Sequence, residues 1–187
     1  MSWTDEDKAA LNSFKRTVDC DNTRFKQIIK ERIINNRFII HVLNNNELDE
    51  DSPDEYLGVN IIPYYAIDHT VTKVENWICF ETNFDEEARY NDIVKHGQII
   101  FYILCDLRNN VERDTGIPRH DLLSALILDH FNWTNIFGMQ IHCVSDRASI
   151  VDTNYACRTL VFEGKFLNSI AKTRNGSTRV VNSDVVR

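Results

Sequence analysis

The sequence predicts an α+β fold with a mixed, largely antiparallel sheet and helices packed on one face. Three observations predict this class. Residues 1–46 carry helical periodicity, residues from Gly58 onward are rich in β-branched and aromatic types, and one further helix separates two groups of strands. No βαβ unit recurs and no segment repeats at a fixed period, so a parallel α/β sheet is disfavoured.

The chain has the size of one domain. Its 187 residues, 43% hydrophobic and 26% charged, are enough for one core and too few for two domains of ordinary size. We expect a single α+β domain over residues 1–167, with its helical part at residues 1–46. Residues 168–187 then form a separate C-terminal arm.

Three segments make up the helical part. Residues 3–18 have weak helical periodicity and an acidic start. A clearer helix follows the capping residues Asp21-Asn22-Thr23, because its apolar positions recur with helical spacing: Phe25, Ile28, Ile29 and Ile33. Residues 38–43 fit a short helix and a buried strand equally well, since their length does not decide between them.

Residues 47–55 predict an exposed loop, because carboxylates crowded together repel one another and bury little. The chain from Gly58 to Phe84 is rich in β-branched and aromatic residues, which predicts strands. Residues 98–105 predict a central strand that is apolar on both faces, with layers above and below. Between these β segments, polar residues 85–96 allow a helical turn.

The second half of the chain predicts a helix and a hairpin. Pro118 stands where helices begin, and an apolar stripe follows it: Leu122, Leu123, Leu126, Ile127 and Phe131. Residues 139–144 and 155–166 predict two strands joined around Ser145-Asp146-Arg147. From Asn168 onward the chain is polar and basic, and it carries Lys172, Arg174, Arg179 and Arg187.

Composition excludes several classes of protein. The net charge of −7 disfavours adhesion of the whole surface to nucleic acid or anionic lipid. No apolar run approaches the roughly 20 residues that cross a bilayer, and the acidic start does not indicate a signal peptide. Five cysteines without a Cys-x-x-Cys pair indicate neither a disulfide framework nor a zinc ribbon.

The strongest enzyme candidate is the doublet His120-Asp121. With an upstream His69 or His96 and a downstream Asp129 or Asp146, it matches the mixed donors of HD-type metal phosphohydrolases. Those enzymes are all-helical, whereas strands flank the doublet here. Asp121 is more simply explained as a carboxylate that stabilises the first turn of a helix.

Two weaker constellations also occur. Pro53-Asp54 and Glu163-Gly164-Lys165 match the halves of a nuclease pattern but lie far apart in the chain. His142, Cys143 and Cys157 are soft zinc ligands, yet adjacent residues on a strand point to opposite faces. We therefore expect no enzyme, with no catalytic, metal-binding or cofactor-binding residues and no cofactor.

The order and texture of the elements resemble those of tailed-bacteriophage head–tail joining proteins, and most closely of tail terminator or tail completion proteins. The resemblance covers roughly residues 22–166. The segments that carry it are Phe25-Lys-Gln-Ile-Ile, Phe38-Ile-Ile-His-Val-Leu, Val59-Asn-Ile-Ile-Pro, Trp77-Ile-Cys-Phe-Glu, Gln98-Ile-Ile-Phe-Tyr-Ile-Leu-Cys, Gly116-Ile-Pro-Arg-His-Asp-Leu-Leu and the terminal strand pair.

The resemblance implies a ring of identical subunits, commonly a hexamer, that caps the tail tube, contacts neck and connector proteins and resides in the virion after assembly in the host cytoplasm. DNA would pass through without specific binding, and no membrane is involved. Acidic residues are the candidates for the channel or for interfaces: Glu47, Asp49, Glu50, Asp51, Asp54, Glu55, Asp85, Glu86 and Glu87. The basic residues Lys172, Arg174, Arg179 and Arg187 are the candidates for an inter-subunit arm.

Overall fold

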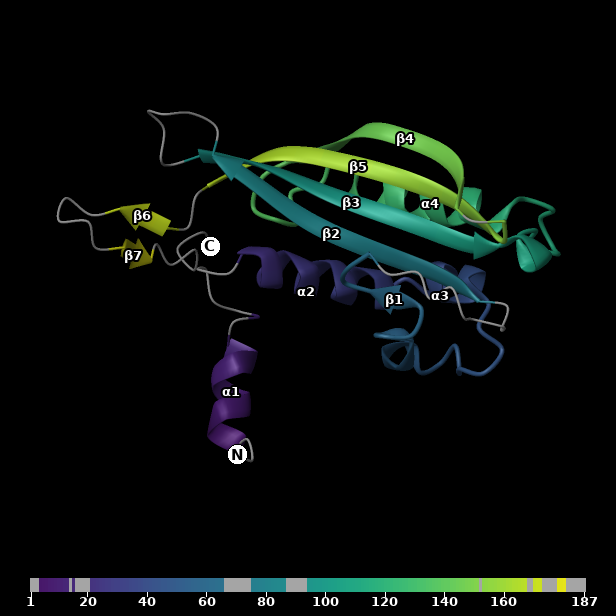
Figure 1. Cartoon of the computed structure of the whole chain (residues 1–187), viewed down its shortest axis with the longest axis horizontal. Coiled ribbons are helices and arrows are strands. Elements are labelled where there is room, and N and C mark those ends of the chain that lie inside the picture. Colours follow the sequence, from purple (N-terminus) through teal and green to yellow (C-terminus); the bar gives the residue numbers. More distant parts are fainter. Residues whose placement is uncertain are drawn as a thin grey trace.

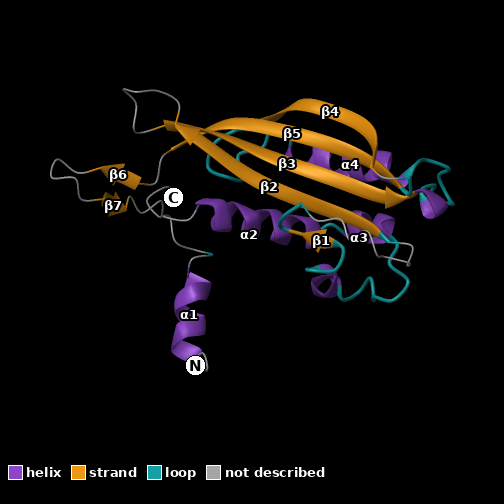
Figure 2. Cartoon of the chain, viewed as in Figure 1, coloured by secondary structure: helices purple, strands orange, loops and turns teal. Residues whose placement is uncertain are grey.

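A five-stranded sheet in the order β1-β2-β3-β5-β4 organises the fold (Figures 1 and 2). The computed structural model describes residues 4–13, 15, 21–65, 75–86, 94–151, 153–167, 170–172 and 178–180. The strands of the sheet are β1 (Ile61–Ile62), β2 (Asn76–Glu86), β3 (Val94–Asp106), β4 (Ile141–Val151) and β5 (Tyr155–Leu167). Strands β2 to β5 pair antiparallel and β1 runs parallel to β2, so the mixed, largely antiparallel sheet is confirmed.

The helices of the described residues are α1 (Asp5–Ser13), α2 (Asp21–Ile34), α3 (Arg37–Leu43) and α4 (Arg119–Phe131). Two 3-10 turns, η1 (Pro53–Tyr56) and η2 (Leu107–Asn109), complete the list. No helix among these residues is long and apolar enough to cross a membrane. The predicted class, α+β, is confirmed.

The core lies between one face of the sheet and the layer formed by α2, α3 and α4. Phe25 of α2 and Phe131 of α4 meet aromatic side chains of the sheet, including Phe101 at the centre of β3. Phe25 also packs edge-on against Phe84 and Phe166, with centroids 5.2 and 5.0 Å away. The predicted stripe of α4 is confirmed, because Leu123, Ile127 and Phe131 are buried in this layer.

The opposite face of the sheet carries a second, smaller apolar cluster around Trp77, Cys79, Leu104, Tyr155 and Cys157. Residues on this face alternate with the core residues along each strand. The central position of β3 is thus confirmed, but no described helix covers this second face.

The segment over residues 38–43 is helical, since Asn36 caps it: its side chain accepts hydrogen bonds from the N–H groups of Phe38 (3.0 Å) and Ile39 (3.3 Å). At the other end, Asn44 takes the left-handed conformation at φ 48°. Two asparagines therefore settle the ambiguity between helix and strand.

The predicted cap of α2 is wrong, because Asp21 and Asn22 lie in the first turn of the helix and bind the sheet. Lys95 of β3 and Arg24 pair with Asp21. The Thr82 hydroxyl donates a 2.8 Å hydrogen bond to Asn22. These polar residues fix the start of α2 to β2 and β3.

Two further boundaries differ from the prediction. Described residues 85, 86 and 94–96 belong to the paired strands β2 and β3, and the rest of the polar segment, residues 87–93, lies outside the described residues. Ser145-Asp146-Arg147 lies inside β4, where a bulge between Cys143 and Ser145 keeps the strand paired with β5. The turn between β4 and β5 therefore comes later, after Val151.

Two elements project from this body (Figure 1). Helix α1 has no buried residue. Strands β6 (Ile170–Lys172) and β7 (Thr178–Val180) pair with each other as a separate two-stranded sheet beyond the end of β5. The predicted C-terminal arm therefore contains two short described strands.

Candidate functional site

The acidic segment, residues 47–55, is an exposed surface that leads through η1 toward the β1 edge of the sheet. Its six carboxylate side chains are all exposed to solvent: Glu47, Asp49, Glu50, Asp51, Asp54 and Glu55. The predicted loop is confirmed, apart from the 3-10 turn over its last residues. Its role as a channel or interface surface stays a prediction.

Two apolar anchors hold the acidic segment against the body. Leu48 packs against the core, and Tyr56 directly after the segment is fully buried. Burial raises the pKa of Tyr56, and the nearby charges of Glu50, Asp49 and Glu55 raise it further. The segment therefore projects a negative field while its backbone stays attached to the core.

A chain of asparagine side chains connects the acidic segment to the sheet. Asn45 donates a 2.7 Å hydrogen bond to Asn60, and Asn60 donates a 2.8 Å bond to the carbonyl of Asn76. Asn76 in turn donates to the carbonyl of Leu43 at 2.9 Å. This network was not predicted from the sequence, although asparagines among apolar strand residues are a signal of buried hydrogen bonds.

The second acidic group stands at the end of β2. Asp85 is exposed, and in the strand register it lies opposite His96, as Glu86 lies opposite Lys95. Glu87 lies outside the described residues. The acidic segment and this second group are therefore attached to different strands and turns, and each is a separate candidate surface.

The doublet His120-Asp121 begins α4 and is occupied by other protein groups. Arg158 of β5 forms an ion pair with Asp121 and donates hydrogen bonds of 2.7 and 3.0 Å to Asp146 of β4. His120 Nδ1 lies 3.0 Å from the side-chain oxygen of Asn110. The arrangement is a charge network that joins α4 to two strands.

Of the other described donors, Asp146 lies near this doublet, where it shares Arg158 with Asp121. His96 points to the face of the sheet opposite to α4, because its neighbour Gly97 lies on the core face, against Phe166 and Phe84. Asp129 is exposed near the end of α4, and His69 lies outside the described residues. Across the described ranges, no group of three or more His, Cys, Asp and Glu side chains is placed to hold a metal ion.

The two weaker constellations also stay apart. Asp54 lies in η1, whereas Glu163 lies on β5, three strands from the β1 edge. In the register of β4 and β5, His142 lies opposite Glu163. Cys157 lies opposite Ser149, further along the same two strands. Cys157 therefore lies opposite neither His142 nor Cys143.

Among the described cysteines, Cys105 and Cys143 do not have the setting of a nucleophile. Burial raises the pKa of the Cys105 thiol, and burial likewise raises that of Cys143. A reactive cysteine needs the opposite shift, toward the thiolate. Both side chains therefore behave as small apolar groups.

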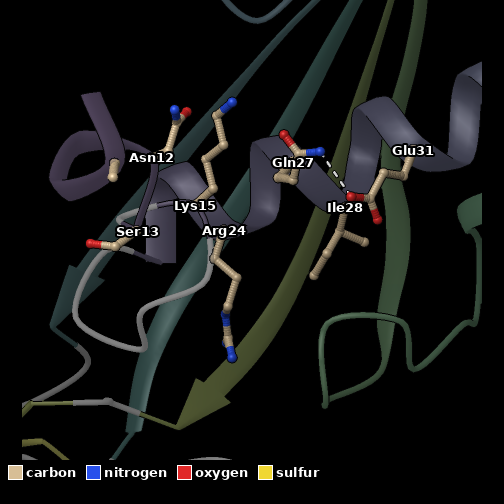
Figure 3. A pocket seen from close by; sticks show the side chains of 8 residues that line it. Asn12, Ser13, Lys15, Arg24, Gln27, Ile28 and Glu31 are labelled. Carbon is tan, nitrogen blue, oxygen red and sulfur yellow. Dashed lines mark hydrogen bonds between the residues drawn. The ribbon is translucent and has the colours of Figure 1, made fainter. Parts of the chain in front are cut away.

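An open groove of about 930 Å³ lies between α1 and α2 (Figure 3). Its polar lining includes Asn12, Lys15 and Arg24. Gln27 donates a 2.8 Å hydrogen bond to Glu31 across one wall. The groove holds neither histidine nor cysteine, so its lining offers no nucleophile with an adjacent imidazole base.

The predicted basic arm is described only in part. Lys172 is the last residue of β6, and Arg179 lies in β7. Arg174 and Arg187 lie outside the described residues. Since β6 and β7 follow β5 directly, the arm begins at the Leu167 end of the sheet.

The comparison with known families bears on this architecture. The sequence model of the YomW family matches residues 17–163. The chain belongs to the YomW family. The family has a phage-derived, SPβ-type name, so the phage relation implied by the resemblance is supported at this level. A search of curated proteins finds no match.

The YomW match covers the body and excludes the projecting elements. It spans α2, α3, α4 and the strands from β1 into β5, where it ends at Glu163. Helix α1 and strands β6 and β7 lie outside it. The helix layer and the five-stranded sheet are therefore the part of this chain that the family match covers.

Proposed function

We propose that this YomW-family protein is a structural subunit of a bacteriophage neck or tail ring. In this role, as a tail terminator or tail completion protein, it caps the tail tube and joins it to the head connector. The phage-related family supports the setting. The observation that carries the structural role is that α1 projects from the body with no buried residue, while β6 and β7 project as a sheet separate from the five-stranded one.

Physical arguments favour partner surfaces for both elements. Helix α1 has nine residues and buries none of them, whereas isolated helices shorter than roughly 12–15 residues are marginal in water. A lone two-stranded sheet is marginal as well. Both elements suit a subunit whose neighbours in an assembly cover them.

The proposed partners are further copies of the chain, in a ring that we expect to be a hexamer, together with the tail tube protein and neck or connector proteins. DNA passes through the ring without specific binding, and the acidic segment supplies carboxylates suited to that passage. The protein then resides in the virion after assembly in the host cytoplasm, catalyses no reaction and contacts no membrane.

Deleting the gene from a phage that encodes it tests the proposal. Lysates examined by electron microscopy should contain filled heads and tails that remain unjoined, and the gene supplied in trans should restore joined particles. Antibody labelling of wild-type particles should mark the head-proximal end of the tail. Normal particles from the deletion, or labelling elsewhere on the virion, would contradict the proposal.

The same labelling separates the alternative within the neck, a head-side stopper or adaptor, which would mark free heads and leave free tails unlabelled. An enzyme centred on His120-Asp121 is less favoured, because Arg158 already pairs with that carboxylate. Hydrolysis of phosphodiesters or nucleotides by the purified protein with a divalent metal, abolished by His120→Ala, would favour the enzyme and overturn the structural role.

A further inference from the structure

Strand β4 leaves one side of the sheet open over residues 145–151. Its first residues are covered: Trp133 and Thr134 exchange backbone hydrogen bonds of 2.8 and 3.1 Å with Ile141, and Asn132 accepts from the N–H of Cys143 at 2.8 Å. Beyond the bulge, no described residue outside β5 forms a backbone hydrogen bond with β4. Within the described part of the chain, the last seven residues of β4 therefore form a free edge.

The register shows which backbone groups face outward. Before the bulge, Ile141 and Cys143 point away from β5, as their bonds to the preceding loop show. The extra residue of the bulge shifts this alternation, so Asp146, Ala148 and Ile150 point outward beyond it. Their N–H and C=O groups are arranged to pair with one more extended strand.

One exposed apolar side chain on this edge favours such a partner over water. Ile150 is 72% exposed, the largest exposure among the large apolar side chains of the described residues. Ala148 is small and exposed, so it leaves the approach to the edge open. A strand laid against residues 146–150 would shield Ile150 and satisfy the outward backbone groups together.

The β6–β7 pair can supply such a strand, but it cannot reach the β4 edge of its own chain. In the register, Asp146 lies opposite Leu160 of β5, roughly 23 Å from Leu167 at 3.3 Å per residue. Strand β6 begins at Ile170, at most about 11 Å beyond Leu167, and β7 is held beside β6. The pair therefore remains near one end of the sheet while the free edge lies toward the other (Figure 1).

We propose that the β6–β7 pair of one subunit adds to the free edge of β4, residues 146–150, in a second copy of the chain. The contact is head-to-tail, because the donor and the acceptor are different surfaces. Repeated head-to-tail contacts form a closed ring when the rotation between neighbouring subunits adds up to a full turn. This inference rests on the proposed function in that it takes the partner to be another subunit of the ring.

A pair of complementary variants tests the contact in the purified full chain. Ala148→Pro removes an outward N–H and places a ring on the edge while leaving the pairing with β5 in place. The matched control, Ala148→Val, keeps the N–H and favours strand geometry. Deletion of residues 168–187 removes the donor and keeps the edge. Circular dichroism and the thermal midpoint confirm that each variant folds, and Ile150→Pro replaces Ala148→Pro if that variant unfolds.

Sedimentation velocity gives the readout. Wild type and Ala148→Val should sediment as an oligomer, and Ala148→Pro and the deletion should each sediment as a monomer. An equimolar mixture of the last two should form a one-to-one dimer, because one chain still has the donor and the other still has the edge. A mixture is needed for this result, since neither chain alone contains both surfaces.

Three results would overturn the inference: an oligomer of Ala148→Pro like that of wild type, an oligomer of the deletion like that of wild type, or a mixture that stays monomeric. The first two results would reject the strand contact but would still agree with a ring that assembles through other surfaces. Conversely, dimers in the mixture together with antibody labelling away from the neck would keep the strand contact and reject the proposed function.

Discussion

Asn76, the first residue of β2, donates a 2.9 Å hydrogen bond to the carbonyl of Leu43, the last residue of α3. The oxygen of the same side chain accepts a 3.2 Å bond from the N–H of Asp106 at the end of β3. Asn76 and Leu43 are both buried. One amide thus joins the helix layer to two strands where water does not reach.

Replacing Asn76 by Ala should lower the free energy of unfolding by roughly 1–3 kcal/mol, because the buried carbonyl of Leu43 and the buried N–H of Asp106 lose their partner. Urea unfolding followed by tryptophan fluorescence measures the loss. Asn83→Ala is the control, since Asn83 lies exposed on the same strand. Equal, small effects of both substitutions would contradict the assigned role.

Gly97→Ala should destabilise the fold by about 1–3 kcal/mol through overpacking. A Cβ at this position would lie 2.5 Å from the Phe166 ring and 2.8 Å from the Phe84 ring. In a Phe166→Leu background, the same substitution should cost clearly less, because the closest obstacle is smaller. Identical costs in both backgrounds, measured by chemical unfolding, would show that the two side chains do not compete for this space.

Glu112 should make stability fall in acid. Backbone N–H groups of Asp114 and Thr115, together with the Thr115 hydroxyl, donate to its carboxylate and hold its pKa at about 2, below the ordinary 4.5. Because this pKa is lowered on folding, the stabilisation is complete above pH 4.5 and is lost as the pH falls toward 2.

The difference in thermal midpoint between wild type and Glu112→Gln should therefore be constant near neutral pH and shrink between pH 4.5 and 2. Thr115→Val, which removes only the hydroxyl donor, should give a smaller difference over the same range. A Gln variant whose deficit is the same at neutral pH and at about pH 2 would contradict the titration of this carboxylate as the cause.

In the assembled ring, carboxylates should face the axis, because a wall of the same charge as DNA lets the duplex slide without adhering. The candidate residues are the acidic segment, with Glu47, Asp49, Glu50, Asp51, Asp54 and Glu55, and the group Asp85, Glu86 and Glu87. A reconstruction of the virion neck measures this directly. An axis lined by Lys and Arg would show that the prediction is wrong.

The double variant Asp49→Lys/Asp51→Lys offers a test in solution. Wild type should not bind a short duplex at low salt, whereas the variant should bind it weakly, and added salt should abolish that binding. Fluorescence anisotropy measures both. Asp114→Lys/Asp129→Lys, which adds the same charge at two exposed positions outside the acidic segment, serves as the control for general effects of charge.

Local sequence patterns alone predicted several elements of this fold. The stripe of α4 and the apolar run of β3 predicted their elements correctly, because spacing alone shows which side chains share a face. The exposed acidic segment also followed from the sequence, since six carboxylates in nine residues cannot be buried.

Tertiary structure decided what depends on residues distant in the chain. Asp121 is an ordinary helix-start residue in the sequence, and only the pairing of β4 with β5 brings Arg158 to it. Ser145-Asp146-Arg147 has the composition of a turn, yet the bulge and the β5 register keep it in a strand with a free edge. Long-range pairing outweighs local preference there, because the ladder's hydrogen bonds are gained only when both strands are in place.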